Sequence, residues 1–331
     1  MAIRLRSAFL VSIALCFFLS LNSAHAEWFS DQQAIMGTTV RVELWHNDAT
    51  TARASIDLAM EQLRRIDALM SPFKPASELF KINKSASVEP VHVGHEIFNL
   101  IAHSMDYSAL SEGGFDITYA TIGRYYDYRL GLRPTDKQIA AALPSIGYRK
   151  LLLDPLNSTI KFARPGMSID LGGIAKGYAV DCAIAELIKQ GISRAIVTAG
   201  GDTRIIGDRV GRPWMIGIRD PRNKEKMIAV LPLTDSAIST SGDYERYFER
   251  DGVRYHHILD PKTGRSITST RSVTIIGPDA TTTDALSTSI FVLGPKKGMA
   301  LVETLPGIEA VIVDAQGKMY YSSSLQNLNP P

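Results

Sequence analysis

Two glycines and a lysine after residue 168 have the types and spacing of an anion-binding turn. An apolar stretch ends at Asp170, Gly172 and Gly173 follow, and a helical pattern begins directly after them. The first turn of a helix offers free backbone N–H groups and the positive end of the helix dipole to an anion. Lys176 would add a full positive charge at the same place. The alternative is a tight turn with a solvated lysine, since neither nucleotide-binding fingerprint, G-x-x-x-x-G-K-[ST] or G-x-G-x-x-G, is matched.

A carboxylate and two hydroxyls share one face of a second predicted helix. Asp284 and Thr288 stand four residues apart, with Ser287 beside them, so they lie on one side of a helix. Carboxylate and hydroxyl oxygens suit a hard cation. Thr281 and Asp284 also fit a variant of the capping box, in which Asp284 only stabilises the start of the helix. Both interpretations are open at this point.

A histidine pair precedes a turn that contains Asp260, Pro261 and Gly264. Proline fixes φ and glycine accepts a positive φ, so the three residues are typical of a turn. Neighbouring residues on a strand point to opposite faces. At most one of His256 and His257 therefore reaches a cleft as an acid, a base or a phosphate ligand. The spacing to other His and Cys residues gives no zinc pattern.

Four further stretches combine glycine, aromatic or hydroxyl residues in ways that suit either a binding site or an ordinary turn. They are Met36–Thr39, Met70–Phe73, Gly113–Thr118 and Ser239–Tyr244. Taken one at a time, each is more typical of a turn.

The composition describes a globular protein and removes several function classes. The chain has 331 residues, of which 45% are hydrophobic and 21% charged, and a formal net charge of +2. Nucleic-acid-binding proteins usually have a strongly basic domain or stripe, so we expect no nucleic acid partner. The 25 glycines and 16 prolines are near ordinary usage, which excludes collagen-like and low-complexity classes.

The first 26 residues have the features of a secretory signal peptide. Arg4 and Arg6 precede the apolar run Ala8–Leu21, which is too short to span a membrane. Small residues at the positions before Glu27 match a cleavage site after Ala26. We therefore expect an exported, periplasmic protein, soluble or associated with the inner membrane.

Cleavage would leave a mature chain, residues 27–331, with a formal net charge of zero, because Arg4 and Arg6 are the only charges removed. Cys16 follows Leu15, where lipid attachment requires a small residue, so a soluble form is favoured. We find no long linker or internal repeat, and a single domain is the simplest organisation.

Hydrophobic periodicity predicts an α+β fold. Helices are expected from about Asp48 to Pro72 and over residues 93–111, 136–142, 173–190, 281–292 and 295–304. Strands are expected over residues 39–44, 151–153, 159–162, 195–198, 203–206, 214–218, 227–232, 244–250, 254–258, 272–276, 308–313 and 319–321. Strands joined by short turns imply largely antiparallel sheets packed with helices.

Read together and in order, these segments resemble the ApbE family of FAD:protein FMN transferases. The matching motifs are MGTTV at 36–40, MSPFKPASEL at 70–79, GGFDIT at 113–118, DLGGIAKGYAVD at 170–181, AGGD at 199–202, TSGDYER at 240–246, HHILDPKTG at 256–264 and DALST at 284–288. The motifs span nearly the whole mature chain. One departure is Phe73, where many members have Tyr, and another is the lack of a convincing lipid-attachment cysteine.

The resemblance implies roles for individual residues. Asp284, Ser287 and Thr288 match the family's metal-binding helix, and Gly173 matches the position whose backbone carbonyl completes the metal shell. His257 matches the histidine beside the reacting diphosphate, whereas His256 is expected to be structural. The positions that match the lining of the FAD site are Met36, Phe73, Gly114, Phe115, Asp116, Asp170, Lys176 and Ile258.

The resemblance also implies a reaction and its partners. A T-fold-like α+β domain would bind FAD with Mg²⁺, transfer FMN to a Thr or Ser hydroxyl of an acceptor protein and release AMP. The expected acceptors are subunits of membrane redox complexes, such as NADH:quinone reductases and Rnf-type complexes. Lys176 and the turn at Gly172 and Gly173 would hold the diphosphate. His257 would act as the general base or orient a phosphate.

Two other functions stay open on the sequence alone. In the first, water replaces the acceptor hydroxyl, and the protein is an FAD pyrophosphatase that yields FMN and AMP. In the second, it is an exported flavin-binding protein with no turnover. Without the family resemblance, the binding role would rank first.

Overall fold

The computed structural model describes residues 26–326, so the predicted signal peptide, apart from Ala26, lies outside the described residues. The α-helices are α1 (Ala49–Met70), α2 (Glu78–Ser85), α3 (His95–Leu110), α4 (Ala120–Gly123), α5 (Asp136–Ala142), α6 (Ala175–Lys189), α7 (Ala280–Val302) and α8 (Ser323–Gln326). None of these described helices has the length and apolar character needed to cross a membrane.

The strands fall into one large sheet and several small ones. The strands of the large sheet are β1 (Glu27–Ile35), β2 (Thr38–His46), β6 (Ala195–Ala199), β7 (Asp202–Ile206), β10 (Ala237–Gly242), β15 (Thr270–Gly277), β16 (Glu309–Asp314) and β17 (Met319–Tyr321). The others are β3 (Val91–His92), β4 (Leu151–Asp154), β5 (Thr159–Phe162), β8 (Trp214–Arg219), β9 (Met227–Leu233), β11 (Tyr247–Arg250), β12 (Val253–His256), β13 (Leu259–Asp260) and β14 (Arg265–Ser266).

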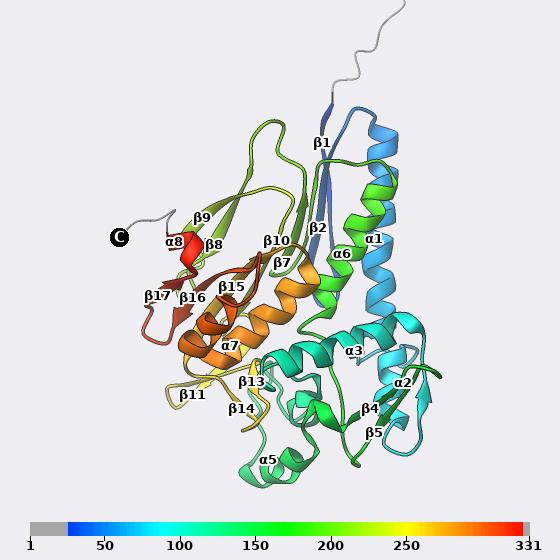
Figure 1. Cartoon of the computed structure of the whole chain (residues 1–331), viewed down its shortest axis with the longest axis vertical. Coiled ribbons are helices and arrows are strands. Elements are labelled where there is room, and N and C mark those ends of the chain that lie inside the picture. Colours follow the sequence, from blue (N-terminus) through cyan, green and yellow to red (C-terminus); the bar gives the residue numbers. More distant parts are fainter. Residues whose placement is uncertain (1–25, 327–331) are drawn as a thin grey trace, which may run out of the picture.

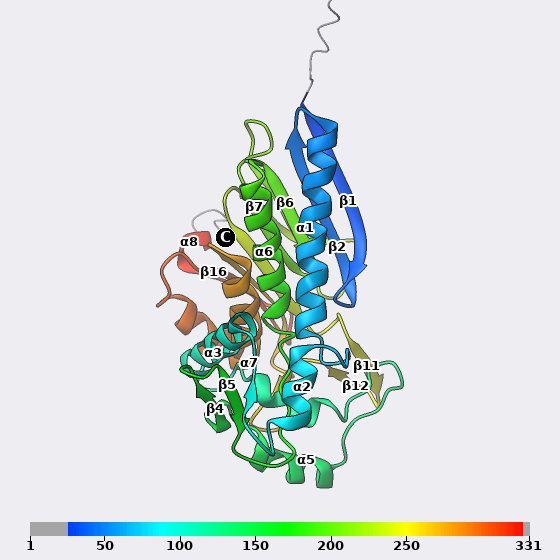
Figure 2. The ribbon, with the colours of Figure 1, turned by 90° about the vertical axis from the view of Figure 1, so that its right-hand side faces the viewer.

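The large sheet confirms the predicted α+β class. Within the described residues its eight strands run in the order β1-β2-β6-β7-β10-β15-β16-β17, and each neighbouring pair is antiparallel. Helices α1 and α6 lie in front of β1, β2, β6 and β7, and α7 crosses the part of the sheet that contains β10 and β15 (Figure 2, Figure 1).

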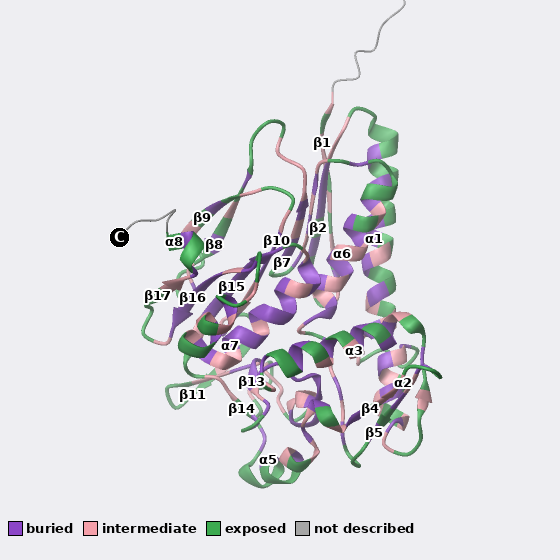
Figure 3. Cartoon of the chain, viewed as in Figure 1, coloured by how far each residue is buried: buried purple, intermediate pink, exposed green. Residues whose placement is uncertain are grey.

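The main hydrophobic core lies between these helices and the sheet. Helix α1 begins after Asp48, whose carboxylate accepts the amide hydrogen of Thr51 at 2.7 Å, and it ends two residues before Pro72. Its inward face packs against β2 and α6 and is buried along its whole length (Figure 3). The predicted start, end and buried face of this helix are therefore confirmed.

The segment between α1 and α6 forms a second layer beyond the ends of those helices. It contains α2, α3, α4, α5 and a small sheet of the strands β3-β5-β4 (Figure 1). Helix α3 packs against α7, and this contact joins the layer to the helices that cover the large sheet.

Two features of the fold differ from the sequence predictions, and a third confirms one. Strand β1, helix α2 and the central strand β10 were not predicted as regular elements. The expected strand over residues 244–250 is shortened to β11. The two helices expected over residues 281–292 and 295–304 are confirmed, because α7 consists of two helical segments separated by a kink at Gly294, where φ is 76° and ψ is 174°, and Pro295 follows. Proline removes one helical hydrogen bond there, and this accounts for the kink.

Candidate active site

The site is built where the first turns of α6 and α7 meet at Gly177. A Cβ placed on Gly177 would overlap the carbonyl oxygen of Ala280 and lie 2.8 Å from the Cβ of Asp284. Only a residue without a side chain allows this approach. The amide of Gly177 donates to the Asp284 carboxylate at 3.0 Å, so the N-terminus of α6 faces a carboxylate of α7.

A lysine lies between two buried carboxylates at this crossing. The Nζ of Lys176 is 2.8 Å from Asp202 Oδ2 and 3.1 Å from Asp284 Oδ2. Burial opposes the charge of the ammonium, but the two carboxylates outweigh it and raise the pKa of Lys176. Burial and the nearby Asp202 raise the pKa of Asp284. Two carboxylates sharing one ammonium leave the cluster short of positive charge.

Hydroxyl oxygens surround the same face of α7. Ser241 Oγ on β10 lies 2.8 Å from Ser287 Oγ and 3.3 Å from Thr288 Oγ1. Thr288 Oγ1 is also 3.3 Å from the position of a Cβ on Gly173. The structure therefore brings together Asp284 and the other three expected metal residues.

The donor set of this cluster fits a hard cation. The side chains and the Gly173 backbone offer oxygen, and oxygen-only ligands suit Mg²⁺ or Ca²⁺. Oδ2 of the buried Asp202 is paired with the Lys176 ammonium at 2.8 Å and has no other hydrogen-bond partner within the described residues. The capping-box alternative fails, because Asp279 caps α7 by accepting the amide of Thr282 at 2.8 Å.

The anion cradle expected at the glycine pair is partly occupied by the protein's own carboxylates. Asp170 Oδ1 accepts the amide of Gly172 at 2.6 Å, and Asp284 accepts the amide of Gly177. Lys176 faces Asp202 and Asp284 rather than open solvent. Of the two amides expected to face a diphosphate, that of Gly172 is engaged by Asp170, whereas that of Gly173 has no hydrogen-bond partner within the described residues. The positive end of α6 is directed at Asp284 instead.

The two histidines have different surroundings, as the alternation of a strand predicts. His256 is 1% exposed, its Nε2 lies 2.6 Å from the carbonyl oxygen of Ile267, and its ring packs edge-on against Phe291. This is a structural position. His257 is less buried as a residue, yet its Nδ1 is sealed from solvent and has no hydrogen-bond partner in the described chain. Burial, aided by His256, Arg246 and Lys176, lowers the pKa of His257 to about 3.

Arg246 is a site candidate that the residue assignments missed. Its carbonyl oxygen accepts the amide of His257 at 3.1 Å. One of its guanidinium nitrogens lies 3.8 Å from the position of a Cβ on Gly37. Met36 and Gly37 form the turn between β1 and β2, both with positive φ, and this turn brings Met36 close to Arg246. Arg246 ends the TSGDYER motif and Asp202 ends AGGD, so both lay within segments already singled out.

The loop after α3 contacts the glycine pair that precedes α6 through the side chain of Phe115. The ring atom Cε2 of Phe115 lies 3.1 Å from the position of a Cβ on Gly173, and Gly114 packs against Leu293. The Asp116 carboxylate accepts the amides of Thr118 and Tyr148 at 2.9 and 2.7 Å. Its oxygens are thus engaged within the protein, and burial raises the pKa of Asp116. Asp116 would support an FAD site by holding Phe115 in place.

Three further expected residues are less closely tied to the cluster. Asp170 accepts the hydroxyl of Tyr119 at 3.3 Å in addition to the Gly172 amide. Ile258 is buried next to the histidine pair. Phe73 is 86% exposed on the turn between α1 and α2, so the structure does not place it against the buried cluster.

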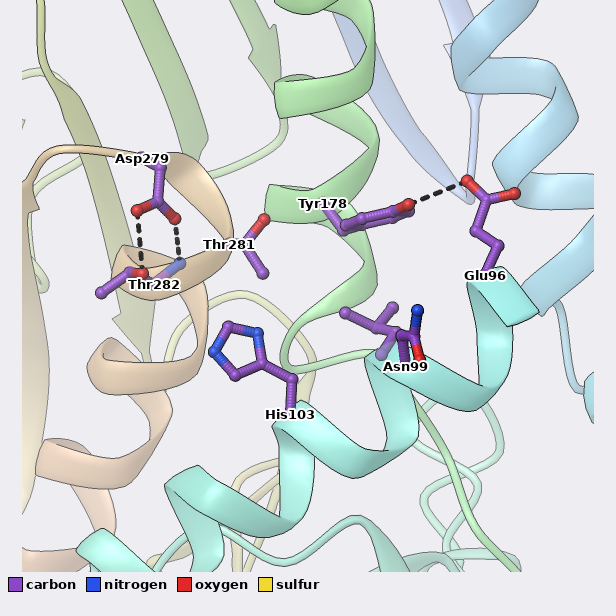
Figure 4. Close-up of a pocket in the computed structure, with 8 residues that line it drawn as sticks. Glu96, Asn99, His103, Tyr178, Asp279, Thr281 and Thr282 are labelled. Carbon is purple, nitrogen blue, oxygen red and sulfur yellow. Dashed lines mark hydrogen bonds between the residues drawn. The ribbon is translucent and has the colours of Figure 1, made fainter. Parts of the chain in front are cut away.

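A separate pocket of about 450 Å³ lies between α3, α6 and the start of α7 (Figure 4). On one side of the pocket, the Tyr178 hydroxyl donates a hydrogen bond to Glu96 at 2.9 Å. On the other side, the Asp279 carboxylate accepts hydrogen bonds from the amide and the hydroxyl of Thr282. None of the predicted site residues lines this pocket. It is therefore distinct from the Lys176 cluster, although α6 and α7 contribute to both.

Comparisons with known proteins agree with the motifs. The ApbE family profile matches residues 36–312. A protein from Vibrio cholerae named FAD:protein FMN transferase is 33% identical, covering 96% of this chain and 97% of its own. One of the same name from Treponema pallidum is 30% identical, covering 92% and 90%.

Solved structures give the same result at the level of the fold. The crystal structure of the ApbE protein of Thermotoga maritima superimposes with a TM-score of 0.84 and 37% sequence identity. The match covers 92% of this chain and all of that one. The fold, the ordered motifs and the length of the sequence match lead to one conclusion: the chain belongs to the ApbE family.

Proposed function

We propose that this protein is an FAD:protein FMN transferase that depends on Mg²⁺. The relatives named above carry that activity in their names and match nearly the whole chain. The observation that carries the proposal is the buried cluster of Lys176, Asp202 and Asp284, which is short of positive charge and bordered by hydroxyl oxygens. Such a cluster suits chemistry on a diphosphate, where charge must be neutralised.

Asp284, Ser287, Thr288 and the carbonyl of Gly173 would hold the magnesium ion. When bound, Mg²⁺ would supply positive charge to the oxygens of the FAD diphosphate. Lys176 neutralises part of the charge on Asp202 and Asp284 and fixes their positions.

In the proposed reaction, a Thr or Ser hydroxyl of the acceptor attacks the FMN-side phosphorus of FAD. A new phosphoester bond forms, the bond between this phosphorus and the bridging oxygen breaks, and AMP leaves with that oxygen. The hydroxyl proton must move to a base. His257 is neutral in the free protein because its pKa is low, so it can accept a hydrogen bond from the hydroxyl. It would take up the proton only beside the anionic diphosphate, because a nearby negative charge raises the pKa of a histidine. Arg246 adds positive charge beside the reacting diphosphate.

The partners and the location are part of the same proposal. The acceptors we propose are flavin-carrying subunits of membrane redox complexes of the NADH:quinone reductase or Rnf type. The signal-like residues 1–26 would direct the protein to the periplasm. FAD is the flavin donor.

The test is incubation with FAD, Mg²⁺ and a soluble acceptor domain of an Rnf-type subunit. We expect one FMN on a Thr or Ser of the acceptor, read by mass spectrometry, and an equal amount of AMP. Asp284→Ala should abolish labelling while the circular dichroism spectrum stays unchanged, because the variant removes the only carboxylate of the expected metal set.

The other outcomes identify the alternatives. Release of FMN and AMP without labelled acceptor would indicate a pyrophosphatase. Binding of FAD without either product would indicate a flavin-binding protein. Labelling by Asp284→Ala at the wild-type rate would contradict the metal assignment.

A further inference from the structure

Strand β11 has one edge that pairs with β12 and one edge that is open. Arg246 O accepts the amide of His257, which identifies these residues as a hydrogen-bonded pair of the antiparallel ladder. Such pairs alternate with pairs whose backbone groups point outward. In this register, the backbone N–H and C=O groups of Phe248 point toward β12, whereas those of Tyr247 and Glu249 point away from it.

The other strand of the hairpin, β12, shows the same alternation of inward and outward backbone groups. Its outward groups at His256 are hydrogen-bonded within the protein. His256, the partner of Tyr247, also directs its backbone groups outward. Its amide donates to Ser266 Oγ at 3.0 Å, and its carbonyl accepts from the same hydroxyl at 2.7 Å. In contrast, the outward groups of Tyr247 and Glu249 have no hydrogen-bond partner within residues 26–326. Both residues are exposed.

The hairpin is held rigid by contacts on both faces. Phe248 stacks on Tyr255 with ring centroids 5.1 Å apart and an angle of 17° between the planes. On the other face, the Arg254 guanidinium lies 4.0 Å from the ring of Tyr247 and pairs with Glu249 at 2.8 Å. Asp251 and Gly252 form the tight turn with positive φ that matches the twist of two strands. A rigid edge loses little entropy when another strand pairs with it.

The position of this edge links it to the site. Other strands of the molecule also have open edges, but the β11–β12 ladder continues directly into the pair Arg246–His257. Neighbouring strands are about 4.8 Å apart. A segment paired with β11 would therefore lie about 10 Å from the strand of His257, and its next few residues could turn into the site.

We infer that the open edge of β11 is the docking edge for the acceptor protein, which adds an extended segment there as a further strand. The inference rests on the proposed transfer of FMN to a protein. Backbone pairing of this kind gives affinity with little dependence on side chains, a known mode of peptide recognition. Pairing with β11 would bring the target Thr or Ser, which adjoins the extended segment of the acceptor, close to His257. This pairing would not involve the FAD-binding residues.

The test variant removes one backbone N–H of β11 that points away from β12 and keeps every hydrogen bond between the two strands. Glu249→Pro does this, because proline is tolerated on a strand edge whose N–H faces solvent. Glu249→Ala is the matched control, since it loses the same ion pair with Arg254 but keeps the N–H. The probe is the soluble Rnf-type acceptor domain. The measurements are KM for this domain, kcat, and FAD affinity by flavin fluorescence.

We expect Glu249→Pro to raise the KM for the acceptor about two- to tenfold, the range for one lost hydrogen bond, with FAD affinity and kcat unchanged. Glu249→Ala should stay close to the wild type. An unchanged KM in Glu249→Pro would overturn the inference, and so would an equal rise in both variants. Failure of the wild type to label the acceptor at all would instead contradict the proposed function.

Hydrogen exchange of the wild-type protein gives a second, independent measurement. An acceptor domain with its target Thr replaced by Val should bind without reacting. The amides of Tyr247 and Glu249 should then exchange more slowly, whereas that of Phe248 is already protected by β12. No added protection at Tyr247 and Glu249 would overturn the inference even if Glu249→Pro fails to fold.

Discussion

At the scale of single residues, the site brings buried acidic and basic groups close together. Asp202 and Asp284 share one ammonium, and the pKa of Asp284 is raised by burial and by Asp202. The same lysine, Lys176, and Arg246 add to burial in lowering the pKa of His257 and keep this residue neutral. In the proposed function, the carboxylates would face a cation, and Arg246 with the neutral His257 would face an anion, which is the combination that a magnesium diphosphate supplies.

His257 gives a prediction at this scale. His257→Asn should bind FAD with near wild-type affinity but release AMP about 10²- to 10⁴-fold more slowly, the usual contribution of a general acid or base. His103→Asn, an exposed histidine on α3, should leave both quantities unchanged. Flavin fluorescence and AMP release measure the two effects.

The pH dependence sharpens this prediction. In the free protein the pKa of His257 lies near 3, far below its ordinary value of about 6.5. The wild-type kcat/KM, which reports on the free enzyme, should therefore show no inflection from this residue between pH 5 and 8. Weaker FAD binding by His257→Asn with normal turnover would show that His257 only positions the substrate.

At the scale of elements, the site depends on the close crossing of α6 and α7. Neither helix alone carries it, because Lys176 comes from α6, Asp284 from α7 and Asp202 from β7. The crossing is possible because Gly177 has no side chain. The amide of Gly177 then reaches Asp284, and the positive end of α6 stabilises that carboxylate.

Gly177→Ala tests the crossing. In an open helix interior this change stabilises by about 1 kcal/mol, because alanine is the better helix former. Here the added methyl group would meet Ala280 and Asp284, and we expect a loss of about 1–3 kcal/mol in the free energy of unfolding, as in other overpacked sites. Denaturant unfolding measures the change, and a gain in stability would contradict the described geometry.

The elements also show what can be predicted from this sequence. Strand β2 and helices α1 and α5 were predicted because their apolar periodicity and capping residues are local signals. Strand β10, with the sequence AISTSG, has no bulky alternation, and its Ser239–Tyr244 stretch looked like a turn. Its buried hydroxyls are satisfied across the fold, for example Ser239 by Thr283 at 2.8 Å, and no local pattern reveals such a partner.

The residues of the site show the same limit: local patterns identify them, but only the fold shows which of them are in contact. Lys176 and Asp284 were identified from local residue spacing and from family motifs, but their pairing spans 108 residues of sequence and depends on how two helices cross. Asp202 lay in a recognised motif, yet its role becomes visible only when β7 is placed beside α6. Phe73 shows the converse, because its motif is clear and its side chain is exposed in the folded chain.

At the scale of the whole molecule, charge and the N-terminus are connected. The formal net charge of +2 falls to zero if residues 1–26 are removed. A neutral protein gives FAD no long-range attraction, so in the proposed function its recognition would come from local charges such as those at Lys176, Arg246 and the proposed cation site. The exported chain would then begin at Glu27, which is the first residue of β1.

A cluster of tryptophan side chains that includes one from the first strand restricts which cleavage positions leave β1 intact. Trp28, on β1, packs against Trp45 and Trp214 with ring centroids 5.1 and 5.0 Å apart, and the Arg209 guanidinium lies 4.8 Å from the rings of Trp28 and Trp214. These are all three tryptophans of the chain. Cleavage after Ala26 keeps this cluster, whereas cleavage three residues later would remove Trp28.

With the proposed export to the periplasm, we expect the mature protein to begin at Glu27, as read by mass spectrometry of its N-terminal peptide. A chain that starts at Glu27 should unfold at the same temperature as the exported protein. Trp28→Ala in that chain should lower the free energy of unfolding by about 2 kcal/mol, somewhat less than a fully buried aromatic side chain because Trp28 is only partly buried. A mature N-terminus beyond Trp28, or an unchanged stability of Trp28→Ala, would show that the first strand is dispensable and that the cluster does not hold it to the sheet.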